Sequence, residues 1–274
     1  MTRYRRLGGT GVKVSPLCLG TMMFGAWGNQ DHDDSIAIIH RALDAGINFV
    51  DTADVYSSGE SEEIVGKALK GRRDTVVLAT KVHGKMGSDI SQRGNSRRWI
   101  MQEVDNSLRR LGTDWIDLYQ LHRHDHNTDI EETLGALTDL VHAGKIRYFG
   151  CSTYPAEAIV EAQWASARSH LGRFVSEQPP YSIFARGIET AVLPAAQRYN
   201  MGVLAWSPLN GGWLTGKYRR DQDTPKDSRM TIRRIPERFD VSFPGNARKL
   251  ELVEDLDQLA QEAGVTMTQL ALAW

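Results

Sequence analysis

Short apolar runs alternate along this chain with longer segments in which apolar residues recur every three or four positions. The short runs have the length and β-branched content of strands, and the longer segments have the spacing of amphipathic helices. The strand-type runs are CLGT (18–21), INFVDTA (47–53), TVVLATKV (75–82), WIDLYQLH (115–122), IRYFGCS (146–152), FVSEQ (174–178) and GVLAW (202–206). Helical spacing relates Ile36 to Ile39 and Leu43, Ile64 to Ala68, Val65 to Leu69, Val104 to Leu108 and Leu111, and Ile130 to Leu134, Leu137 and Val141. Such a βαβα series predicts a parallel sheet with helices packed outside it.

Glycine, proline and polar residues mark the ends of the predicted helices. Gly46, Gly144 and Gly264 follow helical segments, where a residue with positive φ ends a helix. Thr128 followed by Glu131 predicts a capping box at the start of a helix. Pro155 is suited to a first helical turn.

The number of strand-type runs selects among α/β architectures. Seven runs within about 200 residues, with no linker between them, favour an α/β (β/α)8 TIM barrel over a doubly wound sheet. We expect residues 1–274 to form this single domain, with RYRRLGGTGVKV as a β-hairpin ahead of the first barrel strand. The loops at 83–98 and 207–245 follow strands, and such loops build the active-site face of a barrel.

The last segment, VTMTQLALAW, has helical spacing at Met267, Leu270 and Ala271, and only seven strand-type runs precede it. A barrel without its last strand exposes unpaired edges. We therefore expect the eighth strand and helix to lie beyond Trp274, in a natural polypeptide longer by roughly 30–50 residues.

Composition and charge exclude several classes of protein. The chain has 33 basic and 34 acidic side chains among 274 residues, a formal charge of −1, which argues against a nucleic-acid partner. Its two cysteines, Cys18 and Cys151, form no disulfide framework and indicate a reducing compartment. The N-terminus lacks the apolar region of a signal peptide, and no apolar run approaches the roughly 20 residues that span a bilayer. We expect a cytoplasmic protein without a membrane partner.

Reactive side chains fall at the ends of successive predicted strands. Asp51 and Tyr56 follow the second strand, Lys81 ends the third and His122 ends the fourth. In barrels, such residues converge on one face. A tyrosine with its ordinary pKa of about 10 is a poor acid at neutral pH, and a neighbouring ammonium favours its phenolate form. Such a group could protonate a carbonyl oxygen while hydride reaches the carbonyl carbon.

The motifs around these residues are similar to those of one family. DTADVY (51–56), ATK (79–81), DLYQLH (117–122), GCS (150–152), SEQPPYS (176–182) and AWSPLNGGWLTGKY (205–218) together resemble the aldo-keto reductases. The resemblance covers residues 3 to 274, and implies a barrel that binds a nicotinamide cofactor, usually NADPH, and transfers hydride to an aldehyde or ketone. It implies that Tyr56 is the general acid, that Lys81 activates it, that Asp51 pairs with Lys81 and that His122 orients the carbonyl.

The same resemblance implies contacts with the cofactor. Gly20, Thr21 and Met22 match positions beside the nicotinamide ribose, and Ser152 and Gln178 match groups that hold the carboxamide. Asp51 is also expected among the cofactor-binding residues. Thr153 stands where many members have asparagine, which weakens one expected carboxamide contact without removing the site. Trp206 matches the aromatic residue that stacks on the nicotinamide ring. The loop whose backbone binds the pyrophosphate matches Ser207, Leu209, Gly211 and Gly216. Two charged contacts match Lys217 and Arg229. The resemblance implies that the residues that discriminate NADP from NAD lie beyond residue 274, so we expect NADPH on the habit of the family alone.

Other interpretations of single motifs remain open. Alternating histidines in HRHDH (122–126) are found in metal sites, but the late strands end in no further ligands, so we expect no metal. GGWLTGKY (211–218) approaches a nucleoside-triphosphate loop, yet Tyr218 cannot supply the compact hydroxyl that ligates Mg²⁺. The GTG near residue 9 has no helix after it, and is better interpreted as a turn.

A non-catalytic regulatory subunit of the same fold, binding NADP(H) as a sensor, is the alternative from a different functional class. For an enzyme, we expect a small carbonyl compound as partner and a mostly apolar pocket lined by Met23, Phe24, Trp27 and His83. The natural substrate, the physiological direction and the oligomeric state are not indicated by the sequence.

Overall fold

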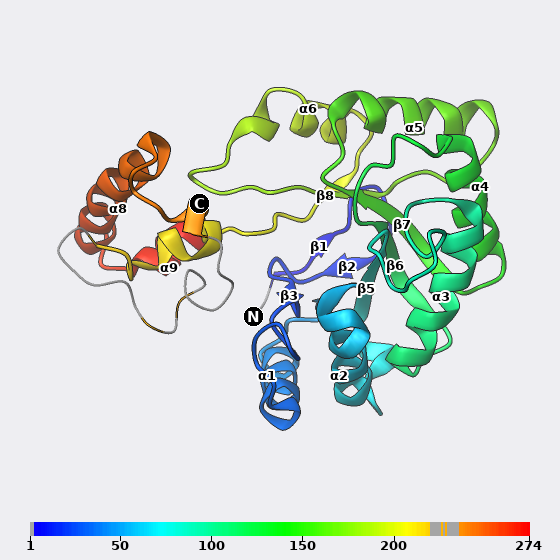
Figure 1. Cartoon of the computed structure of the whole chain (residues 1–274), viewed down its shortest axis with the longest axis horizontal. Helices are drawn as coiled ribbons and strands as arrows, with labels where there is room; N and C mark the ends of the chain where they lie inside the picture. The colour runs from blue at the N-terminus through cyan, green and yellow to red at the C-terminus, as the bar shows by residue number, and fades with distance from the viewer. Residues whose placement is uncertain (1–2, 220–225, 227, 229–235) are drawn as a thin grey trace. The chain divides into compact units, whose positions relative to one another are not determined.

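The computed structural model describes residues 3–219, 226, 228 and 236–274 (Figure 1). These residues group into two compact units. The larger comprises Met1–Pro179 and Ala191–Leu204, and the smaller comprises Pro180–Thr190 and Ala205–Trp274. The expectation that residues 1–274 form one barrel domain stays a prediction.

A curled parallel sheet forms the centre of the larger unit. Its described strands are β3 (Leu19–Gly20), β4 (Phe49–Asp51), β5 (Val77–Val82), β6 (Ile116–Leu121), β7 (Ile146–Ser152), β8 (Ser176–Gln178) and β9 (Gly202–Val203). Each strand pairs in parallel with the next in chain order. This order is that of a (β/α)8 barrel, and it differs from a doubly wound sheet, in which the strand order reverses. The predicted α/β fold class is confirmed.

The predicted N-terminal hairpin is also confirmed. It consists of β1 (Arg5–Arg6) and β2 (Lys13–Val14), which pair antiparallel in a sheet of their own. The predicted run at 202–206 is longer than the strand observed, because β9 ends at Val203.

Helices cover the outer face of the sheet in the larger unit (Figure 1). They are α1 (His32–Asp44), α2 (Glu60–Leu69), α3 (Arg97–Leu111), α4 (Ile130–His142), α5 (Ala156–Arg168) and α6 (Val192–Arg198). The predicted apolar faces point inward: Ile39, Ile64, Val104 and Leu134 are all fully buried in one core cluster. No helix among the described residues is long and apolar enough to cross a membrane.

The helix ends show which local signals were decisive. Gly46, Gly144 and Gly264 all have positive φ just after a helix, as predicted. The capping box at Thr128 is wrong. The N-cap of α4 is Asp129, whose carboxylate accepts from the backbone N–H of Glu131 at 2.7 Å. The Thr128 hydroxyl instead donates to Asp125 at 2.8 Å, so the carboxylate one residue later caps the helix.

The smaller unit contains the short 3₁₀ helices η3 (Gly187–Glu189), η4 (Asn210–Thr215) and η5 (Pro236–Arg238), followed by α8 (Pro244–Glu262) and α9 (Met267–Ala273). The helical spacing at residues 267–271 is thus confirmed. Its core includes three aromatic side chains, with the rings of Trp213 and Phe239 stacked at 5.6 Å and Tyr218 packed against both.

Candidate active site

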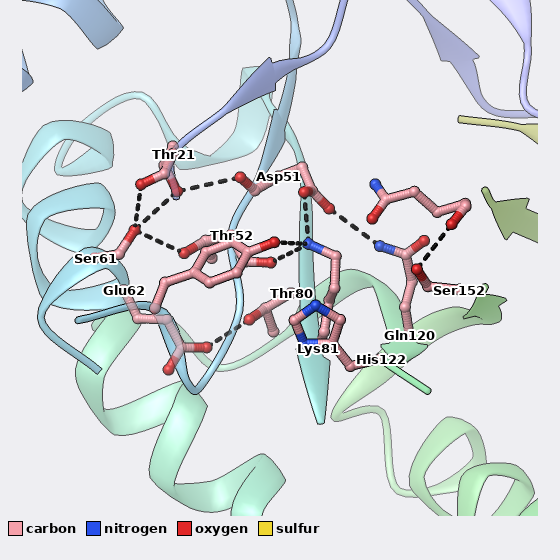
Figure 2. A network of polar contacts seen from close by, with 12 residues as sticks. Thr21, Asp51, Thr52, Ser61, Glu62, Thr80, Lys81, Gln120, His122 and Ser152 are labelled. Atoms are coloured by element: carbon pink, nitrogen blue, oxygen red, sulfur yellow. Dashed lines mark hydrogen bonds and ion pairs between the residues drawn. The ribbon is translucent and has the colours of Figure 1, made fainter. Parts of the chain in front are cut away.

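The carboxyl ends of β4, β5 and β6 bring the predicted catalytic residues of the larger unit together (Figure 2). Asp51 ends β4 and is paired with Ala79 of β5, two residues before Lys81. Lys81 is in turn paired with Gln120 of β6. Because the three strands are parallel and in register, these side chains meet at one edge of the sheet.

The Lys81 ammonium is the centre of this arrangement. It is fully buried, and its Nζ donates to Asp51 Oδ2 at 2.6 Å, to the carbonyl oxygen of Thr52 at 2.7 Å and to Tyr56 Oη at 3.2 Å. All three ammonium protons are therefore used. Burial opposes the charge, but the Asp51 carboxylate and the Tyr56 hydroxyl outweigh it and raise the pKa of Lys81 to about 12. The side chain is a fixed cation at neutral pH.

Gln120 holds the other oxygen of the Asp51 carboxylate. Its Nε2 donates to Asp51 Oδ1 at 3.1 Å, and the glutamine is fully buried. Gln120 was not among the residues predicted from the sequence. A polar residue inside an apolar strand, opposite a buried lysine, was the signal available. Gln120 fixes the orientation in which Asp51 contacts Lys81.

Tyr56 begins the turn η1 (Tyr56–Gly59) that joins β4 to α2, and it is almost fully buried. The two residues after it, Ser57 and Ser58, have φ of 49° and 56°, in the left-handed region. The Ser57 hydroxyl accepts from the backbone N–H of Trp27 at 3.0 Å and donates to the carbonyl of Phe24 at 3.2 Å. These bonds hold the loop after β3, with two predicted pocket residues, against the tyrosine.

His122 lies against Tyr56 with the ring centroids 5.6 Å apart and the planes at 80°. Burial is the main cause that lowers the pKa of His122 to about 2, and the positive charges of Lys81 and Arg123 act in the same direction. The imidazole is therefore neutral at physiological pH. A neutral imidazole can donate one N–H hydrogen bond to a carbonyl oxygen without competing as an acid.

Acidification is expected to destabilise the protein through His122. Because its pKa is about 2 in the folded state and about 6.5 in the unfolded chain, the unfolded state binds more protons between these values. The contribution of neutral His122 to the free energy of unfolding is therefore complete above pH 6.5. Below pH 6.5 the free energy of unfolding falls by about 1.4 kcal/mol for each pH unit. Thermal unfolding of wild type and His122→Asn at pH 7.5 and pH 5 checks this. The variant should lose less stability; equal losses would contradict the assignment.

The predicted carboxamide residues lie at the ends of β7 and β8. Ser152 and Gln178 are register partners, and the Ser152 hydroxyl donates to the carbonyl oxygen of Gln178 at 2.8 Å. Within the described residues, the side-chain amide of Gln178 makes no hydrogen bond. Its polar atoms are thus available to a ligand amide.

The residues after β3 differ in whether a ligand could reach them. Thr21 is fully buried, and its hydroxyl donates to the carbonyl oxygen of Asp51 at 3.1 Å and contacts Ser61 at 2.9 Å. Gly20 is exposed, and a Cβ there would meet nothing within 4 Å. Thr21 therefore supports the frame around Gly20 and Met22, and direct contact of these three residues with a cofactor stays a prediction.

The smaller unit contains a cavity of about 240 Å³ lined by several of the predicted cofactor residues. Trp206, Ser207 and Gly211 line it, and the indole N–H of Trp206 has no partner among the described residues. Gly211 and Gly216 have φ of 72° and 78°. A loop whose glycines have positive φ can approach phosphate closely.

The remaining predicted phosphate contacts lie on the same loop or beyond the described part of the chain. Leu209 accepts two backbone hydrogen bonds that fold the loop, from Gly212 and Leu214. The ammonium of Lys217 lies 5.4 Å from the ring centre of Tyr218. Arg229 lies outside the described residues.

Two cations in this cavity were not predicted from the sequence. Arg238 of η5 and Lys249 of α8 both line it. Burial, followed by the nearby Arg238 guanidinium, lowers the pKa of Lys249. Cations on a helix are usually solvent-exposed residues, so the sequence carried no signal for either. Together they favour an anionic ligand in the cavity.

A buried charge cluster lies behind Lys81. Arg110 of α3 contacts Glu62 at 2.6 Å and Glu103 at 2.5 Å, and both carboxylates are fully buried. The hydroxyl of Thr80, next to Lys81 in β5, donates to Glu62 (Figure 2). The cluster ties α2 and α3 to the strand that carries the lysine.

The HRHDH stretch brings two of its histidines together. The rings of His124 and His126 lie 4.3 Å apart. In the part of the chain that the structure describes, no group of three His, Cys, Asp or Glu side chains could hold a metal ion. The expectation of no metal stays a prediction.

Comparison with known proteins places this geometry in a family. Residues 16–274 match the sequence model of the aldo/keto reductase family. The chain belongs to this family. The identification rests on nearly the whole chain, and the strand order and N-terminal hairpin agree with it.

Curated proteins similar to this chain have names of different kinds. It is 38% identical over 280 residues to a "probable voltage-gated potassium channel subunit beta" of Arabidopsis thaliana, covering 99% of this chain and 83% of that protein. It is 39% identical over 276 residues to the aldo-keto reductase YhdN of Bacillus subtilis, covering 99% and 80%. It is 35% identical over 299 residues to the versiconal hemiacetal acetate reductase of Aspergillus parasiticus, covering 99% and 84%. The proteins similar to this chain thus include some named as reductases and some named as channel subunits.

Proposed function

We propose that this aldo/keto reductase is an NADPH-dependent oxidoreductase that reduces an aldehyde or ketone to an alcohol. The observation that carries the proposal is the Lys81 ammonium, bonded to both Asp51 and Tyr56 at the end of the sheet. A structural ion pair needs only the carboxylate. The additional hydrogen bond from Lys81 to the Tyr56 hydroxyl places the ammonium charge beside the oxygen that becomes a phenolate when Tyr56 gives up its proton.

The side chains of this site have separate roles in the reaction. NADPH, when bound, supplies the hydride that reaches the carbonyl carbon. Tyr56 donates its hydroxyl proton to the carbonyl oxygen, and the Lys81 ammonium stabilises the phenolate that remains. Asp51 keeps the ammonium charged and in place. His122, neutral because its pKa is about 2, donates an N–H to the same oxygen and orients it.

The residues at the strand ends fit the nicotinamide part of the cofactor. The side-chain amide of Gln178, which has no partner within the described residues, and the hydroxyl of Ser152 would hold the carboxamide. In the smaller unit, taken by itself, the backbone around Ser207 and Gly211 would bind a phosphate group beside Trp206. The unpartnered indole N–H of Trp206 within the described residues, together with positive-φ glycines, supports a ligand in that cavity.

A regulatory subunit is the second candidate, because several similar proteins are named potassium channel subunit beta. Such a protein would bind NADP(H) at the same residues and turn over aldehydes negligibly. Slow exchange of bound cofactor, with no reduction of any carbonyl, would favour this candidate over the enzyme.

A panel of carbonyl compounds tests the proposed function. Aldehydes and ketones are offered to the purified protein with NADPH and, separately, with NADH. We expect NADPH to be oxidised with at least one aldehyde and NADH to be a poorer donor. Prior dialysis against EDTA should leave the rate unchanged, because the proposed chemistry uses no metal. Absence of NADPH oxidation across the panel, or loss of activity in EDTA, would contradict the proposal.

A further inference from the structure

A buried carboxyl group next to the proposed carboxamide site has no role in the proposed reaction. Glu177 of β8 is fully buried, and its register partner in β7 is Cys151. Its Oε1 accepts from the backbone N–H of Tyr154 at 3.2 Å. Its Oε2 has no hydrogen-bond partner among the described residues. No cation forms an ion pair with it in that part of the chain.

The buried carboxyl group of Glu177 lowers the stability of the folded protein when it is ionised. Burial raises its pKa to about 7, against 4.5 for an ordinary glutamate. The groups that face it are the Cys151 thiol, the Tyr154 side chain and, electrostatically, the Arg123 guanidinium. Since its folded pKa is raised, the folded state binds more protons between pH 4.5 and 7, and stability falls as the pH rises through that range. A carboxyl that lowers stability at neutral pH is a candidate functional group.

Glu177 contacts the turn between β7 and α5. Thr153 has φ of 57°, in the left-handed region, and its N–H donates to the carbonyl oxygen of Gln178 at 3.2 Å. Pro155, the N-cap of α5, provides no side-chain cap for the helix. Three consecutive residues, Ser152 to Tyr154, are thus bonded to Glu177 and Gln178. Glu177 supplies the only side-chain acceptor among these bonds.

We propose that Glu177 is a positioning residue of the cofactor site: its carboxylate fixes the strained Ser152–Tyr154 turn so that Ser152 and Gln178 face the nicotinamide carboxamide. The inference rests on the proposed function, because it assigns these two residues to the carboxamide. Glu177 itself contacts neither the cofactor nor the substrate. A purely structural role predicts that its removal destabilises the protein. A positioning role predicts weaker cofactor binding without loss of stability.

Two variants of Glu177 separate these roles. Glu177→Gln keeps the shape and one acceptor oxygen, and Glu177→Met removes both the charge and the acceptor. Ser176→Ala is the matched control, because Ser176 is buried in the same strand and its hydroxyl also has no partner within the described residues. The dissociation constant of NADPH, from fluorescence titration, and the Tm are measured at pH 8 for each protein.

For Glu177→Met we expect the NADPH Kd to rise about tenfold, while the Tm at pH 8 stays level or rises because a buried charge is gone. Glu177→Gln should fall between it and wild type, and Ser176→Ala should bind like wild type. Unchanged Kd in both variants would overturn the proposal. A fall in Tm together with weaker binding, or failure of both variants to fold, would overturn it in favour of a structural role. If the wild-type protein does not bind NADPH, the proposed function itself fails, and the titration of the wild-type protein shows this directly.

Discussion

Replacing Tyr56 by phenylalanine is expected to abolish carbonyl reduction while NADPH binding stays nearly intact. The variant loses only the hydroxyl, and its ring can still pack against Trp27 and His122. General acid catalysis is worth roughly 10²–10⁴ in rate, so kcat should fall by that factor. Steady-state rates with the best aldehyde of the panel, and a fluorescence titration with NADPH, give the two quantities.

Tyr4→Phe is a matched control for this experiment. The Tyr4 hydroxyl donates to the carbonyl oxygen of Gly46 at 3.2 Å, on the exposed surface, so its removal should leave the rate unchanged. A Tyr56→Phe protein that keeps half of the wild-type turnover would show that another group donates the proton.

Replacing Lys81 by methionine is expected to lower both the rate and the stability. The cation that stabilises the Tyr56 phenolate is lost, so kcat should fall at every pH near neutral. The Asp51 carboxylate then remains buried without its partner. Breaking a buried ion pair in this way costs about 3 kcal/mol. Chemical denaturation gives the free energy of unfolding, and the pH–rate profile gives the chemistry.

A second substitution separates the two effects of Lys81. In the Lys81→Met background, Asp51→Asn removes the unpaired charge, so stability should recover substantially while the rate does not. A normal pH–rate profile in Lys81→Met would contradict the role of the lysine, because the acid would then not depend on the ammonium.

The helices and strands could be predicted from the sequence because they depend on local periodicity. The site residues that lie at the ends of predicted strands could be predicted as well. Asp51, Lys81 and His122 come directly from apolar strands, and consecutive parallel strands bring their carboxyl ends to one edge. The helix ends at Gly46 and Gly144 were predictable because positive φ is a local property. These signals reside within a few neighbouring residues.

Features that depend on partners distant in the chain could not be predicted in the same way. Thr128 has the sequence of a capping box, but its hydroxyl is engaged by Asp125, a competition that only the folded loop reveals. Gln120 and Glu177 interrupt apolar strands, yet which groups they contact depends on register with the neighbouring strands. Lys249 lines a cavity because of how α8 packs against η4 and η5, which helical periodicity does not specify.

The fate of the hydride distinguishes an enzyme from a sensor most directly. The protein is incubated with NADPH deuterated at the transferable position and with an aldehyde from the panel, and the product is analysed by mass spectrometry. Reduction at the Tyr56 site predicts an alcohol that contains one deuterium in wild type, and a yield lower by roughly 10²–10⁴ after the same time in Tyr56→Phe. The proposed reductase activity would be contradicted if the wild-type protein formed no deuterated alcohol and the bound NADPH stayed reduced.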